Sequence, residues 1–274
     1  MQRPPQLADP AALAARRARA TPQGGFLRDA VRDDVQERLK EVNRSFTRPA
    51  VVTGFPGGWA ARLPSAVIVP DAEVLALEPG AHDLVIHDLC LPWASDPVGQ
   101  LVQARRALEP DGMLLATLFG GQTLHELRST LAEAEARVTG GLSPRVAPMA
   151  EIRDMGALLQ RAGLALPVAD ATPFDVSYPD AYALMRDLRA MGEGNALAGR
   201  VRHFTRRAVL DDAARLYAEH FGAEDRVPAT FEVLTLTGWA PAESQPKPLR
   251  PGSATTRLAD VLGTTETPLD QSDE

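Results

Sequence analysis

Residues 83–118 follow one pattern that restricts the chain to a small set of folds. The apolar run at Asp83–Ile86 predicts a buried strand. Asp96-Pro97 then marks the start of a helix, since Asp is a strong N-cap and Pro suits the first helical position. Glu109–Gly112 predicts a tight turn, and Met113–Leu118 returns as a strand. Strand, helix and strand in this order predict a right-handed, parallel βαβ unit.

Further elements extend this unit in both directions. Apolar side chains at three- and four-residue steps predict an amphipathic helix over 26–46. Thr123 and Glu126 have the spacing of a capping box, which predicts the start of another helix. The other expected elements are strands at 50–52, 67–69, 171–178 and 230–237, and helices at 151–162, 180–191 and 208–221. Together they predict an α/β sheet that two late helices interrupt.

Composition excludes several classes of function. The formal net charge is −7, and an acidic chain lacks the excess of Lys and Arg that nucleic-acid phosphates require. The single cysteine, Cys90, excludes an intramolecular disulfide and a cysteine-clustered metal site, and agrees with a reducing compartment. The sequence contains neither the roughly 18 apolar residues of a membrane span nor a recognisable secretory signal. A cytoplasmic location is therefore expected.

The two ends of the chain are compositionally biased. Residues 1–25 are rich in Ala and Arg and are interpreted as a mobile arm, whose basic residues include Arg16, Arg17 and Arg19. A solvated helical arm, a targeting-like leader and a contact for an acidic partner are all open interpretations of these arginines. Residues 241–274 are interpreted as a C-terminal extension with an acidic tail. The main domain is expected at 26–240.

Several strings resemble one protein family over about residues 26–263. In order, they are Phe119-Gly120-Gly121-x-Thr123-Leu124-x-Glu126-Leu127-Arg128, Gly140-Gly141-x-Ser143-Pro144-Arg145-Val146-x-Pro148, Met185-Arg186-Asp187-Leu188-Arg189-Ala190-Met191-Gly192-Glu193-x-Asn195, Gly238-Trp239-x-Pro241-x-Glu243-Ser244-Gln245 and Pro251-Gly252-Ser253-Ala254. They resemble the respiratory complex I assembly factor family of class I methyltransferase fold. The mitochondrial member of that family is described as a protein-arginine hydroxylase acting on a complex I subunit. More distantly, the strings are similar to the malonyl-carrier-protein methyltransferase of biotin synthesis.

The resemblance implies an α/β, Rossmann-like class I methyltransferase fold, with a seven-stranded, mostly parallel sheet and helices on both faces. It also implies S-adenosylmethionine as the cofactor, bound over the carboxyl ends of the first strands, where open parallel sheets generally bind ligands. In this chain the fold is expected to be shortened at the second strand and to carry a late helical insert at 179–225.

The loop that should hold the cofactor departs from the family pattern. In the family the first strand ends in an acidic residue and a Gly-rich loop, because backbone approaches the cofactor closely there. An ungapped match puts Val51 at the acidic position and Thr53 and Phe55 at two of the glycines. The glycines present are Gly54, Gly57 and Gly58, of which only Gly57 matches. The loop is interpreted either as a weak nucleotide-binding candidate or as a tight turn without a ligand.

A second departure concerns the carboxylate that binds the cofactor's ribose. Too few residues separate Val52 from Val67 for helix, strand and helix, so the second strand and its carboxylate are expected to be missing. Asp71 matches the family's adenine-side acidic position instead. The missing charge-assisted hydrogen bond would be worth about 1.5–3 kcal/mol. The sequence therefore favours a lost cofactor site.

Polar residues follow the next strand. His87 and Asp88 are interpreted either as a general base with its orienting carboxylate or, since neighbouring strand residues point to opposite faces, as strand-end or surface polar groups. Asp88 also remains a weak cofactor candidate. Cys90 is expected to pack rather than react, because nothing nearby in sequence would lower its pKa. Trp93 keeps a family position, whereas Pro92 replaces a histidine.

The later strings are better preserved than the cofactor loop. Their polar residues predict a protein-substrate or partner surface above the sheet, and the alternative is a set of helix caps and surface ion pairs. The residues are Arg145, Arg186, Arg189, Glu193, Asn195, Glu243 and Gln245.

Three functions are consistent with these patterns. The first is a methyltransferase-family protein that has lost its S-adenosylmethionine site and acts as a protein-binding assembly factor or chaperone-like partner. The second is an active methyltransferase or arginine hydroxylase that uses a rebuilt loop, and the third is a scaffold subunit whose helical insert is the interface. No catalytic residue is assigned, and His and carboxylates are too scattered to define a facial triad of metal ligands.

Overall fold

The structure is a computed structural model that describes residues 6–147, 149–246 and 263. The chain divides into two units, Met1–Ala242 and Glu243–Glu274, and every helix and strand given below belongs to the first. The Pro251–Ala254 string and the predicted acidic tail lie outside the described residues.

A six-stranded sheet in the order β2-β1-β3-β4-β6-β5 forms the centre of the first unit. Its strands are β1 (Pro49–Thr53), β2 (Val67–Val69), β3 (His82–Asp88), β4 (Leu108–Phe119), β5 (Ala165–Tyr178) and β6 (Val227–Trp239). Strands β2, β1, β3 and β4 pair in parallel, whereas β6 pairs antiparallel with both β4 and β5. The Rossmann-like α/β fold is confirmed, with six described strands in place of the expected seven.

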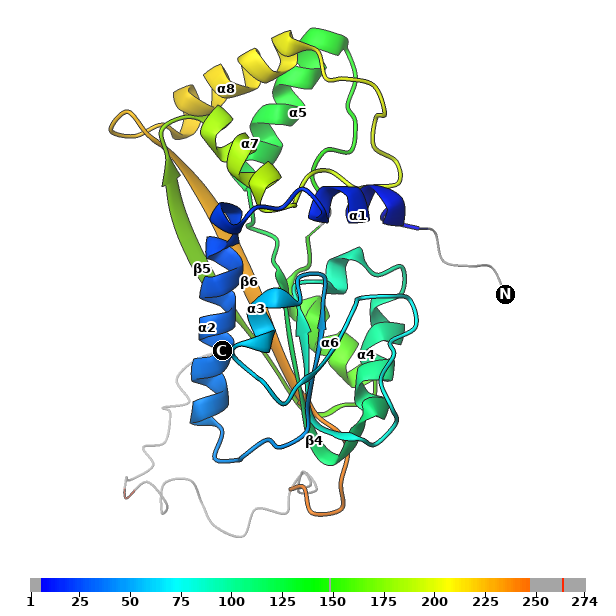
Figure 1. The fold of residues 1–274 in the computed structure, drawn as a ribbon. Helices are drawn as coiled ribbons and strands as arrows, with labels where there is room; N and C mark the ends of the chain where they lie inside the picture. Colours follow the sequence, from blue (N-terminus) through cyan, green and yellow to red (C-terminus); the bar gives the residue numbers. More distant parts are fainter. Residues whose placement is uncertain (1–5, 148, 247–262, 264–274) are drawn as a thin grey trace, which may run out of the picture. The chain divides into compact units, whose positions relative to one another are not determined.

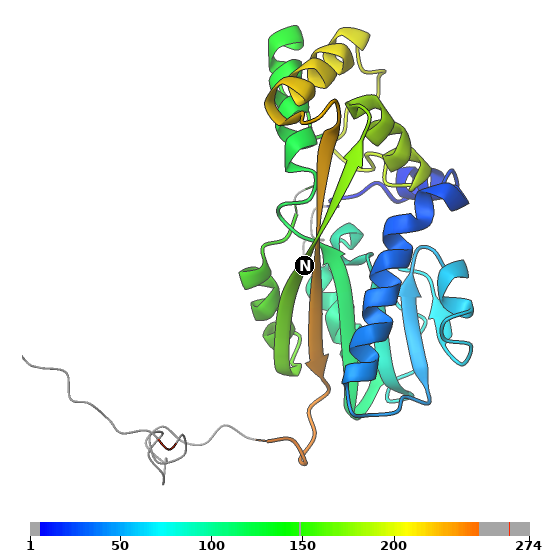
Figure 2. The ribbon, with the colours of Figure 1, turned by 90° about the vertical axis from the view of Figure 1, so that its left-hand side faces the viewer.

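Helices cover both faces of this sheet (Figures 1 and 2). They are α1 (Pro10–Arg17), α2 (Phe26–Glu41), α3 (Gly57–Ala60), α4 (Pro97–Ala107), α5 (His125–Thr139), α6 (Ile152–Arg161), α7 (Ala181–Ala190) and α8 (Arg207–Phe221), with short 3-10 turns at Pro22–Gly25 and Leu91–Trp93. Helices α2 and α3 pack on one face through Val35 and Trp59. Helices α4 and α6 pack on the other face. Because both faces are covered, every residue of β1 and β3 is buried.

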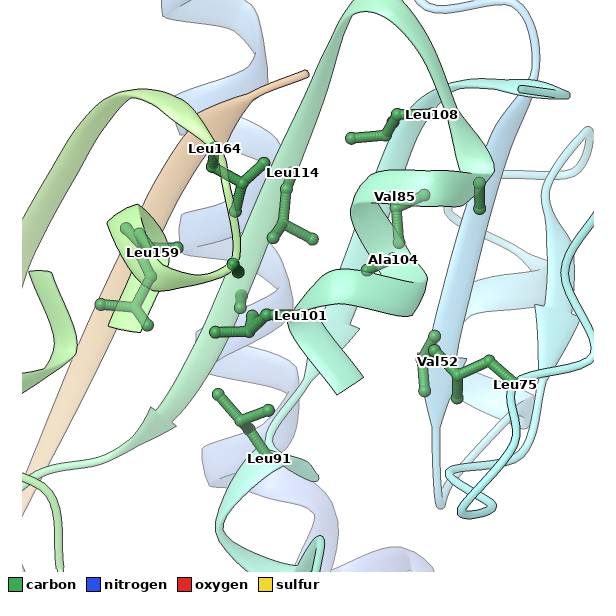
Figure 3. Close-up of a cluster of buried hydrophobic side chains, with 14 of the residues drawn as sticks. Val52, Leu75, Val85, Leu91, Leu101, Ala104, Leu108, Leu114, Leu159 and Leu164 are labelled. Atoms are coloured by element: carbon green, nitrogen blue, oxygen red, sulfur yellow. The ribbon is translucent and has the colours of Figure 1, made fainter. Parts of the chain in front are cut away.

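The core between the sheet and α4 is built from small and branched apolar side chains. Val52, Val85 and Leu114 come from three neighbouring strands and share one core cluster with Leu101 of α4 and Leu159 of α6, and Figure 3 shows Val52 beside Leu75. These strands are in register, with Val52 opposite His87 and Val85 opposite Leu114. This packing and register hold the ends of the parallel strands side by side.

The predicted βαβ unit is present as β3, α4 and β4. The Asp96 carboxylate caps α4 by accepting from the Gly99 N–H at 2.8 Å. The prediction of a tight turn before β4 was wrong, because β4 begins at Leu108 and continues through Asp111, which takes a left-handed φ of 63°. The Asp111 N–H bonds to the Ala240 carbonyl at 3.1 Å, so this segment extends the sheet region.

As expected, no further strand lies between Val52 and Val67, where the chain forms only the single-turn helix α3. Strand β2 pairs in parallel with β1, although it has only three residues. The crossover fits because its helix, α3, is a single turn. The sheet is therefore shortened at its second strand, as expected, and β2 forms the edge of the described sheet.

The capping box expected at Thr123 and Glu126 does not form. Leu124 precedes α5 with a φ of 51°, and no side chain caps the helix. The Thr123 hydroxyl instead donates to the Glu232 carbonyl at 3.0 Å, and Glu126 accepts from the N–H and hydroxyl of Thr230 at 3.1 and 2.6 Å. Both side chains therefore attach α5 to β6, which a local sequence pattern cannot foresee.

The late helical insert is confirmed as α7 and α8, which lie between β5 and β6 in the chain. These two long strands extend beyond the parallel part of the sheet and carry the helices there (Figure 2). Helix α5 joins them, and its Leu127 shares an apolar cluster with Leu184, Leu216 and Phe231. We call α5, α7, α8 and these strand ends the helical lobe.

The N-terminal segment differs from the predicted mobile arm. Its α1 helix buries Leu13, and the Asp9 carboxylate accepts from Arg200 at 2.9 Å. The Asp9 N–H bonds to the Ala196 carbonyl at 2.8 Å, which ties the start of α1 to the loop after α7. The segment is a packed strap because these distant partners hold it.

Candidate functional site

The carboxyl ends of β1, β2 and β3 meet at one edge of the sheet, because these three strands are parallel neighbours. The loop at 54–58 follows β1, Asp71 follows β2, and Asp88 ends β3. This is the edge where sheets of this kind generally bind ligands. The predicted cofactor residues are therefore brought together.

Arginine side chains occupy the space against two of the three candidate glycines. A Cβ atom added to Gly54 would collide with the guanidinium of Arg17, and one added to Gly58 would collide with that of Arg32. At Gly57, by contrast, no atom lies within 4 Å of the position of a Cβ. The protein's own arginine side chains thus lie close against the backbone at Gly54 and Gly58.

Arg17 also takes both oxygens of Asp71. Its two terminal nitrogens donate to the carboxylate at 2.7 and 2.8 Å, and the side chains are only 15% and 14% exposed. Burial works against the charged guanidinium, but the hydrogen bonds and charge of Asp71 outweigh it and raise the pKa of Arg17. The Arg17 guanidinium lies 5.7 Å from the centre of the Phe55 ring as well. Asp71 is therefore satisfied within the protein.

Asp88 lies beneath the loop. Its Oδ2 accepts from Trp59 Nε1 at 2.6 Å and from the Thr53 hydroxyl at 3.0 Å, with Arg32 at 3.5 Å. Its Oδ1 is buried and has no hydrogen-bond partner among the described residues. This carboxylate holds α3 and the loop against the strand end.

His87 lies on the opposite face of β3, where its Nε2 is 3.3 Å from Gln100 Oε1 on α4. Burial lowers the pKa of His87. Because His87 and Asp88 point to opposite faces, they do not form a base with its orienting carboxylate. They are strand-end polar groups, as the alternative predicted, since β3 ends at Asp88, but they are not surface groups, since their exposed fractions are 0% and 3%.

Cys90 packs under the same loop. Its sulfur accepts from the Gly54 N–H at 3.2 Å, and the thiol donates to the Asp88 carbonyl at 2.9 Å. Burial raises the pKa of the Cys90 thiol well above its usual value, so the reactive thiolate is disfavoured. Cys90 therefore packs as a buried side chain, as the sequence predicted.

The protein's own groups occupy several positions at this edge. Val51, which stands at the acidic position of the family, is buried in the core against α2 and α3. The Asp71 carboxylate is paired, and Arg17 and Arg32 fill the cradle over Gly54 and Gly58. No group of three His, Cys, Asp or Glu side chains among the described residues could hold a metal ion.

A pocket of about 320 Å³ lies at the same end of the sheet, between α1, α5 and α7. Four of the predicted partner residues line it, namely Arg145, Arg189, Glu193 and Asn195. Arg186 is exposed and is not among the lining residues. Glu243 and Gln245 belong to the second unit, which is not placed relative to this pocket. We call it the arginine pocket.

Two of these residues mainly hold loops together. Arg145 donates to Glu135 at 2.6 and 3.0 Å and to the Thr205 hydroxyl at 3.0 Å. Arg145 is the main cause of the lowered pKa of Glu135. Asn195 donates to the Pro144 carbonyl at 2.8 Å. The loops before α6 and after α7 are thereby fixed at the mouth of the pocket.

The sequence interpretation missed Arg28, Arg32 and Trp59. Arg28 and Arg32 lie on the buried side of α2, with exposed fractions of 8% and 4%, and Arg28 lies 3.9 Å from the centre of the Phe55 ring. A signal was present, since both follow apolar residues of the buried stripe, Leu27 and Val31. Charged residues beside a buried stripe indicate a specific partner within the fold.

No model of a known protein family matches the chain. The arginine-hydroxylase NDUFAF5, mitochondrial, of Danio rerio is 36% identical over 233 residues, which cover 84% of this chain and 72% of the relative. The protein of the same name from Dictyostelium discoideum is 39% identical over 205 residues, which cover 73% of this chain and 47% of the relative.

A second kind of relative is named a methyltransferase. The malonyl-(acyl-carrier protein) O-methyltransferase of Xylella fastidiosa is 36% identical over 178 residues, which cover 65% of this chain and 58% of the relative. Among solved structures, the YcgJ protein of Bacillus subtilis aligns with a TM-score of 0.49 at 10% identity, over 77% of this chain and 99% of the other. The chain spans 47–72% of the length of the two arginine-hydroxylase relatives described above.

Proposed function

Because the chain belongs to the family of the arginine-hydroxylase NDUFAF5, we propose that it is a methyltransferase-like protein that has lost its S-adenosylmethionine site and acts by binding a protein partner. Its role would be that of an assembly factor or chaperone-like protein. In this proposal the chain is a pseudoenzyme, in which a former cofactor site has become part of the protein's own packing.

One observation carries the proposal. The Arg17 guanidinium covers Gly54 and pairs with both oxygens of Asp71, and Arg32 covers Gly58. A cofactor at this edge would have to displace a partly buried ion pair, and removing one partner of such a pair leaves the other charge uncompensated. The arrangement supports a site that no longer admits the cofactor.

The partner implied by the resemblance is a subunit of respiratory complex I. The relatives are named arginine-hydroxylase. For this chain the activity, substrate and partner are proposals, because it spans only part of its relatives. The surface proposed for the partner surrounds the arginine pocket and includes the exposed Arg186 and Arg189 of α7.

The rival function is an active methyltransferase or arginine hydroxylase that works through a rebuilt loop. The open space at Gly57 favours it, since this glycine matches the family and a Cβ placed there would have no atom within 4 Å. A scaffold subunit that uses the helical lobe as its interface is a third function. A cytoplasmic location also stays a proposal, and the relatives are named mitochondrial. None of the described helices has the length and apolar character needed to cross a membrane.

The first test is calorimetric titration with S-adenosylmethionine and with S-adenosylhomocysteine, at concentrations that would reveal millimolar binding. We expect no heat beyond dilution from either compound. Micromolar affinity for either one would contradict the proposal and would direct the search to a methyl acceptor or a hydroxylation target.

The second test separates binding from cofactor use in cells. Gly57→Ala should fold normally, because a Cβ meets no atom there, yet it would obstruct a cofactor that lies against this backbone. In a strain that lacks the gene, we expect Gly57→Ala to restore assembled complex I as well as the unchanged chain does. Arg186→Glu with Arg189→Glu should restore less, because it reverses the charge of the proposed partner surface. Failure of Gly57→Ala with normal protein levels would support the enzyme instead.

A further inference from the structure

The arginine pocket has an apolar interior. Its walls include Phe119 and Phe231 from the sheet, Leu127 from α5 and Leu188 from α7. Trp93, which follows β3, lines it as well. At about 320 Å³ the pocket lies at the small end of the range that holds small-molecule ligands. Its interior therefore suits one apolar chain of medium length.

Arginines that pair with no other described residue surround this interior. Arg16 and Arg19, three residues apart at the end of α1, and Arg189 of α7 all line the pocket. Their side chains form no hydrogen bond or ion pair with any described residue, and the Nε of Arg16 is buried without a partner. Three cations at one pocket are thus left without a compensating contact from the described part of the chain.

The acidic groups nearby do not neutralise them. Glu193 is the one carboxylate among the lining residues. The opposite charges that act on it most strongly are those of Arg17 and Arg28. Arg145, the fourth arginine at the pocket, is already paired with Glu135. The pocket therefore combines an apolar interior with a net positive mouth.

We propose that the arginine pocket binds a medium-chain carboxylate, with the apolar chain inside and the carboxylate against Arg16, Arg19 and Arg189. Arginine suits this role because its planar group presents paired donors that match the two oxygens of a carboxylate. Burying the apolar chain removes its surface from water. The carboxylate supplies the negative charge that would compensate these arginines. Neither a neutral chain nor a small anion satisfies both parts of the pocket.

This site is distinct from the filled cofactor edge. The lining residues include none of 54–58 and not Asp71. Arg17 pairs with Asp71, whereas Arg16 and Arg19 line the pocket. Carboxylate binding would therefore stand whether or not S-adenosylmethionine binds.

The test is calorimetric titration with four probes that vary one property at a time. Decanoate has both the chain and the charge, decanol lacks the charge, decyltrimethylammonium reverses it, and acetate lacks the chain. We expect decanoate to bind with one-to-one stoichiometry, decanol to bind more weakly, and the other two to give no heat. Equal binding of decanoate and decanol, or no binding of decanoate, would overturn the proposal.

Helix α7 provides a matched pair of variants. Arg189→Gln should weaken decanoate binding about three- to fivefold, the range expected for a partly exposed charge contact, and should leave decanol binding unchanged. Arg186→Gln, one turn earlier on the same helix and not a lining residue, should change neither. Arg16→Gln tests the opposite wall in the same way. Equal effects of Arg189→Gln and Arg186→Gln on decanoate would show that general surface charge, not the pocket, attracts the anion.

Discussion

Arg17 connects two parts of the protein that are far apart in sequence. Its guanidinium leaves α1, pairs with Asp71 after β2 and covers Gly54 after β1. A single side chain therefore links α1 to the ends of two strands. No spacing rule could have revealed this, because the contact spans 54 residues.

Replacing Arg17 should destabilise the fold. Arg17→Ala leaves the largely buried Asp71 carboxylate without its partner, so we expect a loss of about 2–3 kcal/mol in the free energy of unfolding. Arg19→Ala, just beyond the end of the same helix but exposed, should change stability by less than about 0.5 kcal/mol. Urea denaturation of the two variants measures the difference. Equal, small effects would mean that Arg17 does not hold α1 in place.

Asp83 should contribute a pH-dependent part of the stability. Burial opposes its charged form, but hydrogen bonds from the backbone N–H groups of Thr47 and Arg48 outweigh this and lower the pKa of Asp83. Since the folded pKa is below the unfolded value of about 3.9, the stabilisation is fully present above that value. It is lost as pH falls from about 4 through the folded pKa.

Asp83→Asn should therefore cost about 1–2 kcal/mol at neutral pH. At about pH 3 the difference from the unchanged chain should be smaller, because this pH lies below the pKa of about 3.9 of the unfolded carboxylate, so part of the stabilisation is lost. Urea denaturation at both pH values is the measurement. Asp225→Asn, in an exposed turn with a φ of 58° that Asn also tolerates, is the control. A deficit that stays constant with pH would rule out this origin.

At the scale of elements, the helical lobe and the parallel part of the sheet have separate cores. Leu216 of α8 packs among α5, α7 and β6, whereas Leu101 of α4 packs between the parallel strands and α6. Both are fully buried, with exposed fractions of 1% and 0%. Regions with separate cores can open separately.

Leu216→Ala and Leu101→Ala should thus have similar costs and different local effects. Each should lower the free energy of unfolding by about 2–4 kcal/mol. Hydrogen exchange should rise mainly in α7 and α8 for Leu216→Ala, and mainly in α4 and β3 for Leu101→Ala. The same exchange pattern in both variants would show that the two cores unfold as one unit.

The sequence predicted these elements where the pattern is local, and missed what depends on distant partners. The period of apolar residues placed α4, α6, α7 and α8 to within a residue or two, because each buries one face. The start of α5 was interpreted wrongly, since Thr123 and Glu126 bond to β6 rather than to the helix. Strand β2 was identified as a strand, but its pairing with β1 was not, because register is a long-range property.

At the scale of the whole molecule, the order of the strands determines which of the predicted cofactor residues lie together. Gly54, Gly57, Gly58, Asp71 and Asp88 do meet at one edge, because the parallel order of the strands brings their ends together. What fills that edge could not be predicted, since Arg17 and Arg32 come from helices that precede the sheet in the chain. The family pattern predicted which residues meet at this edge, but not the arginines that pack against them.

The strap formed by α1 joins the helical lobe to the sheet. At its start Asp9 bonds to Arg200, and the Leu7 carbonyl accepts from the Ala198 N–H at 2.9 Å. At its end Arg17 bonds to Asp71. An eight-residue helix is too short to be stable alone in water, so α1 persists only while it is docked.

The two ties should therefore act as one. If the loss of either contact releases the whole helix, the loss of the second contact has little further effect. Arg200→Ala combined with Arg17→Ala should then lower the free energy of unfolding by less than the sum of the two single variants. Urea denaturation of the chain, the two single variants and the double variant measures this coupling. Additive costs would mean that each end docks independently. In that case the end at Asp71 could open toward a ligand while the start of α1 remained on the helical lobe.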